Sequence, residues 1–125
     1  MNDDSFSNVP PAVRPTVQAA RRMVKAIAPK AEEINYRGGQ PRSRTYMWKL
    51  VRYAFNGANV VGIGTFATHS TLFFYRGREL DDGTGLLEGS GKDSRYVTLR
   101  DAADAERPAV KLLVRKAFKL SGAIK

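Results

Sequence analysis

The spacing of apolar residues changes twice along this 125-residue chain, and these changes constrain its fold most strongly. Over residues 13–27 apolar side chains recur every three or four positions, as on one face of a helix. From Ile34 to Tyr75 the chain is rich in β-branched and aromatic residues, which favour strands. A second helical spacing follows over residues 110–120. This order predicts an α+β fold, a two-layer sandwich of a mostly antiparallel sheet with the N- and C-terminal helices packed on one face.

Turn-forming residues set the expected boundaries of the strands. Asn56-Gly57 lies between two β-type runs and is the strongest short hairpin signal. A second turn is expected at residues 68–70, and a later strand at residues 95–100. The polar, glycine-rich stretch at residues 37–44 is expected to be a basic loop.

Proline and capping residues set the boundaries of the helices. Pro15 suits the first turn of the N-terminal helix, and Pro108 that of the C-terminal one. Asp104 is the expected N-cap of the second helix, and Ser121-Gly122 is its expected end. The expected buried face of this helix is Val110, Leu113, Val114, Ala117 and Leu120.

Composition indicates a single domain over residues 1–125, with residues 1–10 expected to be flexible. The chain has no cysteine, so disulfides and thiolate metal sites are excluded. Its polar, acidic start does not match a secretory signal, and no run approaches the roughly 18 apolar residues of a membrane span. We therefore expect a cytoplasmic protein with no membrane partner.

The charge is strongly positive, +9 overall, and unevenly distributed. From Arg14 to Arg78 there are twelve basic residues and only two acids, whereas residues 79–106 carry eight acids and three bases. The chain is purely basic after Glu106. Such an excess attracts anions, so an anionic ligand or nucleic acid is an expected partner. The alternative is that net charge serves only solubility.

Two glycine motifs are similar to phosphate-binding sequences but lack their context. The run from Gly62 to Ala67 matches the dinucleotide pattern, yet a β-like segment follows where a helix is required. The run from Gly89 to Lys92 lacks the earlier glycine and the following Ser or Thr of a phosphate-binding loop. The single histidine, His69, is expected to have a structural or surface role.

An anion site is still expected in the second glycine-rich segment, because successive backbone N–H groups can form an anion nest. Its candidate residues are Arg78, Glu88, Gly89, Gly91, Lys92 and Arg95, supported by the basic helix stripes. The alternative is a plain turn with solvated cations.

The acids of the same segment offer a second candidate site, for a hard cation. Glu79, Asp81 and Asp82, with Glu88 nearby, form the only carboxylate cluster. Intramolecular charge balance with neighbouring arginines is the competing interpretation, and the one we favour.

Aromatic and basic residues alternate through the strand region, a pattern suited to stacking single-stranded bases. Alternation alone would bury every second aromatic side chain in the core. The residues are Trp48 and Tyr36, Tyr46, Tyr53, Tyr75 and Tyr96, interleaved with Arg37, Arg42, Arg44, Lys49, Arg52 and Arg95.

Residues 31–36 and 72–100, with the basic closing helix, resemble the YdhG-like family of uncharacterised bacterial domains. Two runs carry the resemblance, LFFYRGRELDD and GLLEGSGKDSRYV, preceded by the acidic pair Glu32-Glu33. The resemblance implies a compact domain of antiparallel sheet and helices. One kind of member is a proposed frataxin-like iron chaperone, so iron is implied by this resemblance alone. Related sequences often have histidine where this chain has Tyr96.

The sequence thus predicts a non-enzymatic binding module for an anionic partner or small ligand. An iron or metal chaperone, a nucleic-acid-binding protein and an enzyme with an unrecognised site are the alternatives. No cofactor is predicted from the residues themselves.

Overall fold

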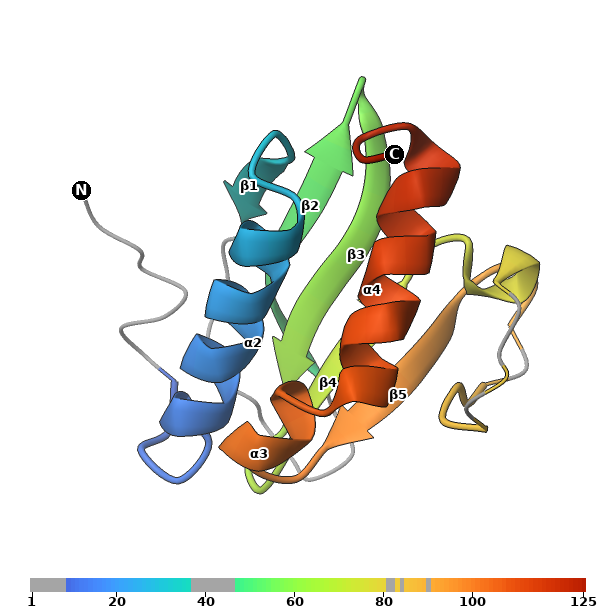
Figure 1. Ribbon diagram of the computed structural model, residues 1–125. Coiled ribbons are helices and arrows are strands. Elements are labelled where there is room, and N and C mark those ends of the chain that lie inside the picture. Colours follow the sequence, from blue (N-terminus) through green and yellow to red (C-terminus); the bar gives the residue numbers. More distant parts are fainter. Residues whose placement is uncertain (1–8, 37–46, 81–82, 84, 90) are drawn as a thin grey trace.

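In the computed structural model the chain forms two layers, a five-stranded antiparallel sheet and a layer of helices (Figure 1). The structure describes residues 9–36, 47–80, 83, 85–89 and 91–125. The elements in chain order are α2 (Arg14–Ile27), β1 (Glu32–Asn35), β2 (Trp48–Phe55), β3 (Ala58–Thr65), β4 (Ser70–Phe74), the 3₁₀ turn η1 (Gly77–Glu79), β5 (Arg95–Leu99), α3 (Ala102–Ala105) and α4 (Pro108–Ser121). The predicted α+β sandwich is confirmed.

The strands pair in sequence order, from β1 to β5, so each strand lies beside its neighbour in the chain. The expected hairpin joins β2 to β3, with φ of 51° at Asn56 and 79° at Gly57. Positive φ at both central residues is what a type I′ turn requires, and its twist matches that of the strands.

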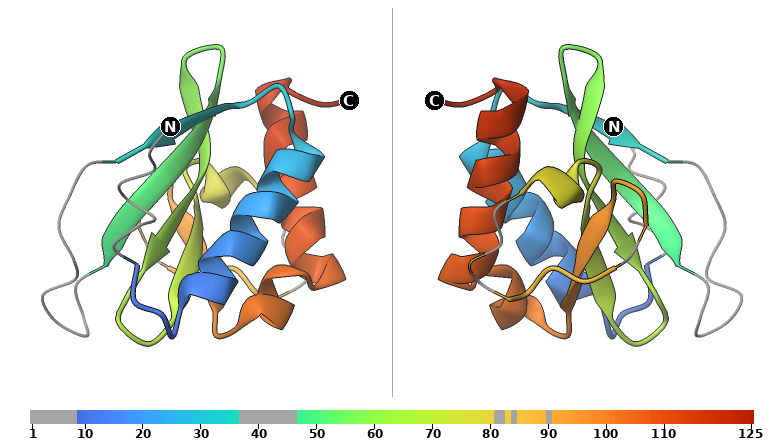
Figure 2. Two further views of the ribbon diagram at one scale, coloured as in Figure 1. Left: turned by 90° about the vertical axis from the view of Figure 1, so that its left-hand side faces the viewer. Right: turned by 90° about the vertical axis from the view of Figure 1, so that its right-hand side faces the viewer.

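Both long helices cover the same face of the sheet, as the side views of Figure 2 show. The core between the layers is built from the inward side chains of the strands and the apolar stripes of α2 and α4. Its largest fully buried members include Tyr53, Phe74, Phe118, Leu50 and Ile63. We call the other face of the sheet, which neither α2 nor α4 covers, the open face.

The start of the C-terminal helical region differs from the sequence prediction. Asp101, rather than Asp104, is an N-cap, and its carboxylate accepts a hydrogen bond of 2.9 Å from the Asp104 backbone N–H. It caps the short helix α3, while α4 begins separately at Pro108 after Arg107, which makes no side-chain cap. Leu120, expected to be buried, is 41% exposed. The helix ends as predicted, with Gly122 at φ 90°.

Two other sequence predictions concern segments that the structure describes little or not at all. The basic loop at 37–44 lies outside the described residues. Of the segment 1–10, only Val9 and Pro10 are described, and Val9 is buried. Among the described residues, none of the helices combines the length and apolar character that crossing a bilayer requires.

Candidate functional site

The open face contains a hollow of about 570 Å³ between β2, β4, β5 and the segment that precedes β5. We call it the open-face hollow. Its floor is formed by side chains of the strands, among them Lys49, Thr71 and Phe73. Gly89, Gly91 and Arg95 form part of its rim.

Aromatic side chains provide most of the apolar surface of the hollow. Phe73 and Tyr96 are register partners on β4 and β5, and Phe73 contacts Tyr75 edge-on with 5.5 Å between ring centroids. Tyr96 is 38% exposed, so its ring is accessible to a ligand. At the far end of the hollow, Phe66 stacks on His69 at 4.6 Å.

Two cationic side chains line the hollow, and no carboxylate does so among the described residues. The Lys49 ammonium lies 5.8 Å from the Tyr36 ring centroid and 5.7 Å from that of Phe73. The Arg95 Nη1 donates hydrogen bonds of 2.7 Å to the carbonyls of Gly91 and Ser94, which orients the guanidinium at the rim. The hollow therefore offers positive charge beside exposed ring surface.

A hydrogen-bonded pair of tyrosines next to the hollow joins the end of β1 to the end of β4. The hydroxyls of Tyr36 and Tyr75 lie 2.6 Å apart. The Arg52 guanidinium carbon lies 5.1 Å from the Tyr36 ring centroid. Burial, followed by the hydrogen bond to Tyr36, raises the pKa of Tyr75 above its ordinary value. Tyr75 is thus held as a neutral hydrogen-bonded phenol at neutral pH.

The six residues predicted for the anion site are only partly brought together. Gly89, Gly91 and Arg95 line the hollow. Glu88 pairs through its backbone with Tyr96, and its carboxylate accepts a 3.3 Å hydrogen bond from Thr98 at the edge of the hollow. The other two predicted residues do not line it: Arg78 uses its backbone N–H to bind the Asp93 carbonyl, and Lys92 is exposed.

The basic stripes of α2 and α4 were expected to support the same site, and the structure corrects this. Both helices lie on the opposite face of the sheet from the hollow. One small ligand cannot contact both surfaces through the sheet.

The candidate metal residues show no metal geometry where they are described. Glu79 forms a bidentate pair with Arg76 at 2.7 and 2.8 Å, and hydrogen bonding to this guanidinium lowers the pKa of the carboxyl. This pair agrees with the interpretation that Glu79 balances the charge of a neighbouring arginine. Asp81 and Asp82 lie outside the described residues. In the described part of the chain, no three His, Cys, Asp or Glu side chains are grouped so as to hold a metal ion.

The first glycine motif lies in a β-strand, and the histidine packs against a neighbouring aromatic ring. Gly62 and Gly64 lie within β3, and β4 rather than a helix follows them. His69 stacks on Phe66 and has its Nδ1 3.4 Å from the Thr68 hydroxyl, longer than the roughly 2.6–3.2 Å of a nucleophile–base pair.

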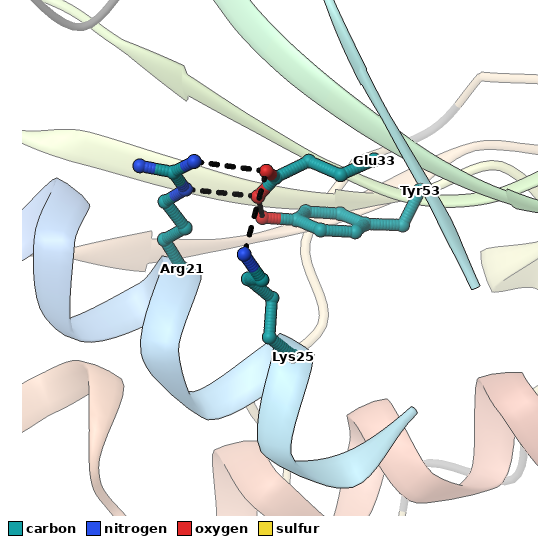
Figure 3. Close-up of polar contacts among 4 residues, drawn as sticks. All are labelled: Arg21, Lys25, Glu33 and Tyr53. Carbon is teal, nitrogen blue, oxygen red and sulfur yellow. Dashed lines mark hydrogen bonds and ion pairs between the residues drawn. The ribbon is translucent and has the colours of Figure 1, made fainter. Parts of the chain in front are cut away.

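A second polar cluster lies on the helix side of the sheet and fastens α2 to β1 and β2 (Figure 3). Arg21 donates two hydrogen bonds of 2.9 Å to Glu33, and Tyr53 donates one of 2.6 Å. Lys25 lies 3.7 Å from the same carboxylate. Burial alone would raise the pKa of Glu33, but these hydrogen bonds and charges outweigh it and lower the pKa. We call these four residues the Glu33 clamp.

The residues of the Glu33 clamp hold the helix layer against the sheet, whereas the sequence suggested that some of them contribute to ligand binding. Glu33 belongs to the acidic pair of the family resemblance, and Arg21 and Lys25 to a basic helix stripe. Because the carboxylate is satisfied by three partners, these groups have little capacity left to recruit a ligand.

Sequence reasoning missed Phe66, Phe73 and Met47 as members of the site. The signal was present for Phe73, because Thr71 and Phe73 alternate along β4 and so share one face of it, with Tyr75 following just after the strand. Comparisons with protein-family models, with curated proteins and with solved structures gave no match.

Proposed function

We propose that this chain is a non-enzymatic binding module that takes an anionic ligand bearing a flat ring in the open-face hollow. The observation that carries this proposal is the combination in one hollow of aromatic rings, the cations Lys49 and Arg95, and no carboxylate among the described lining residues. The YdhG-like affiliation is a separate prediction, and the proposal does not depend on it.

The electrostatic part of the argument concerns Lys49. Its side chain is exposed on the open face and lies beside two aromatic rings, and it forms no ion pair with the described residues. An anion entering the hollow would meet this charge beside apolar walls, where attraction is stronger than in bulk water.

The aromatic part concerns Tyr96 and its neighbours. A flat ligand ring that covers Tyr96 and the edge of Tyr75 buries apolar surface on both partners, and aromatic pairs contribute beyond the area they bury. A ring with an attached anion therefore satisfies both features of the hollow, whereas a bare anion or a neutral ring satisfies one.

The test is a titration followed by backbone amide chemical shifts. Adenosine monophosphate and naphthalene sulfonate are the anionic ring probes, with adenosine and inorganic phosphate as controls that lack one feature each. We expect the anionic ring probes to shift the amides of Lys49, Tyr96 and Thr98 and to bind about tenfold tighter than either control.

The variants Lys49→Gln and Lys119→Gln form a matched pair, because each removes one exposed lysine charge and Lys119 lies on α4 behind the sheet. Lys49→Gln should weaken both anionic probes, and Lys119→Gln should leave them unchanged. Shifts confined to the helices, or none with either ring anion at millimolar concentration, would overturn the proposal.

A further inference from the structure

Four aromatic rings form a continuous row across the open face, from β5 to the end of β1. Tyr96 is the register partner of Phe73, Phe73 contacts Tyr75, and the Tyr75 hydroxyl meets that of Tyr36. We call these four residues the ring row. With neighbouring strands roughly 4.8 Å apart, the row spans about 19 Å of the sheet, more than one small ring can cover.

Cations accompany the ring row along its length. Arg52 lies over Tyr36, Lys49 lies near both Tyr36 and Phe73, and Arg95 stands at the rim beside the Tyr96 end. The Glu88 carboxylate accepts a hydrogen bond from Thr98 at the β5 edge of this surface. Rings and positive charges therefore repeat together from one side of the sheet to the other.

The central strand has glycines at two positions of this face, and side chains of the neighbouring strands occupy the space beside them. Gly62 is the register partner of both Arg52 and Phe73, and Gly64 is that of Lys49 and Thr71. The Phe73 ring fills the space over Gly62 and belongs to the floor of the open face, whereas Tyr96 is exposed and Tyr75 and Tyr36 are half-buried.

We propose that the ring row binds single-stranded nucleic acid, with bases stacked on its more exposed rings, Tyr96 above all, and phosphates near Lys49, Arg52 and Arg95. Stacking of bases on aromatic side chains of a sheet and tracking of the backbone by cations are the two terms by which single strands are held. An acidic protein segment would match the cations but not the repeating rings. The proposal rests on the function proposed above, since it uses the same hollow and extends it along the row.

The test is fluorescence anisotropy with four labelled octamers: a single strand of RNA, a single strand of DNA, an abasic strand with the same number of phosphates, and a duplex. We expect the strand with bases to bind at least about tenfold tighter than the abasic strand, since stacking contributes that much or more. Its affinity should also exceed that of adenosine monophosphate, because the row is longer than one nucleotide. With about two or three phosphates contacted, log K should fall against log salt with a slope of about −1.4 to −2.

Tyr96→Leu tests the contribution of base stacking, and Lys49→Gln tests the contribution of phosphate attraction. Tyr96→Leu should bring the affinity for the base-containing strand close to that for the abasic strand, and Lys49→Gln should reduce the salt slope by about 0.7. Circular dichroism of each variant shows whether it is folded. If Tyr96→Leu is unfolded, shifts of the Tyr96 ring protons in the unmodified protein answer the same question, because the base-containing strand should move them and the abasic strand should not.

The outcomes separate this inference from the proposed function. Equal binding of the base-containing and abasic strands, or binding of the octamer no tighter than the mononucleotide, overturns the inference and leaves the small-ligand function standing. Absence of binding by both the octamer and the mononucleotide overturns both. Tighter binding of the duplex than of the single strand also overturns the inference, because paired bases cannot stack on the row.

Discussion

The ring of Phe73 lies over Gly62, its register partner in the neighbouring strand, and occupies the space that a side chain at position 62 would need. A Cβ atom built on Gly62 would overlap this ring. Since Phe73 is only 8% exposed and is held between neighbours, it cannot move aside without disturbing the open face.

The substitution Gly62→Ala should therefore destabilise the protein by about 1–3 kcal/mol, the usual cost of overpacking. Urea unfolding measures the change. Gly83→Ala is the matched control, because a Cβ built there meets nothing within 4 Å and its φ lies outside the positive range that disfavours alanine. Equal effects of the two substitutions would show that the ring does not require the glycine.

The fold was predictable from the chain because its signals are local. Asn56-Gly57 specifies a hairpin through its own backbone preference, and the periodic apolar residues specify the buried helix faces. The reason for Gly62 was not predictable, because it depends on Phe73 from another strand. The same holds for Glu33, whose three partners come from α2 and β2.

The candidate site was predictable only where its residues are close together in the sequence. Gly89, Gly91 and Arg95 are close in sequence, so one turn brings them together. Lys49 and Tyr96 come from strands separated by two others, and only the sheet order places them on one surface. The basic helix stripes were expected to support the anion site, and they lie on the other face of the sheet, because the sequence does not show on which face a loop before β5 places its residues.

The Glu33 clamp should make stability depend on pH in the acid range. The pKa of Glu33 is lowered in the folded protein, so the stabilisation is fully present above the unfolded pKa of about 4.3 and is lost as pH falls through the folded value. Glu33→Gln should cost about 2 kcal/mol at pH 7, because it weakens charge-assisted hydrogen bonds.

The measurement is the urea midpoint of the parent protein and of Glu33→Gln from pH 7 to pH 3. The difference between them should begin to shrink as the pH falls below about 4.3, where the unfolded chain takes up a proton at Glu33, and should disappear once the pH is below the folded pKa. Glu32→Gln serves as the control at the exposed neighbouring position and should change the midpoint little. A difference independent of pH would exclude the ionised carboxylate as the source of stability.

The position of the N-cap leads to a separate prediction about α3. Asp101→Ala removes the acceptor for the Asp104 N–H and should destabilise the protein by about 1 kcal/mol. Asp101→Asn keeps a capping oxygen and should cost only a few tenths of that value. Thermal unfolding of both variants measures the effect, and equal losses would show that the carboxylate acts by charge instead of as a cap.

The hydrogen bond between Tyr36 and Tyr75 predicts a loss of stability in alkali. Because burial and this hydrogen bond raise the pKa of Tyr75, the folded protein keeps a proton that the unfolded chain releases above about pH 10. Stability is therefore fully present below that pH and declines as the pH rises toward the folded pKa. Tyr75→Phe removes this ionisation, so the stability of the variant should fall less steeply than that of the parent between pH 9.5 and 11. At pH 7 the variant should be less stable by about 1 kcal/mol, because it lacks the hydrogen bond.

Urea unfolding of both proteins over this range measures the slopes. Parallel slopes would mean that the Tyr75 hydroxyl titrates in the folded protein as it does in the unfolded chain.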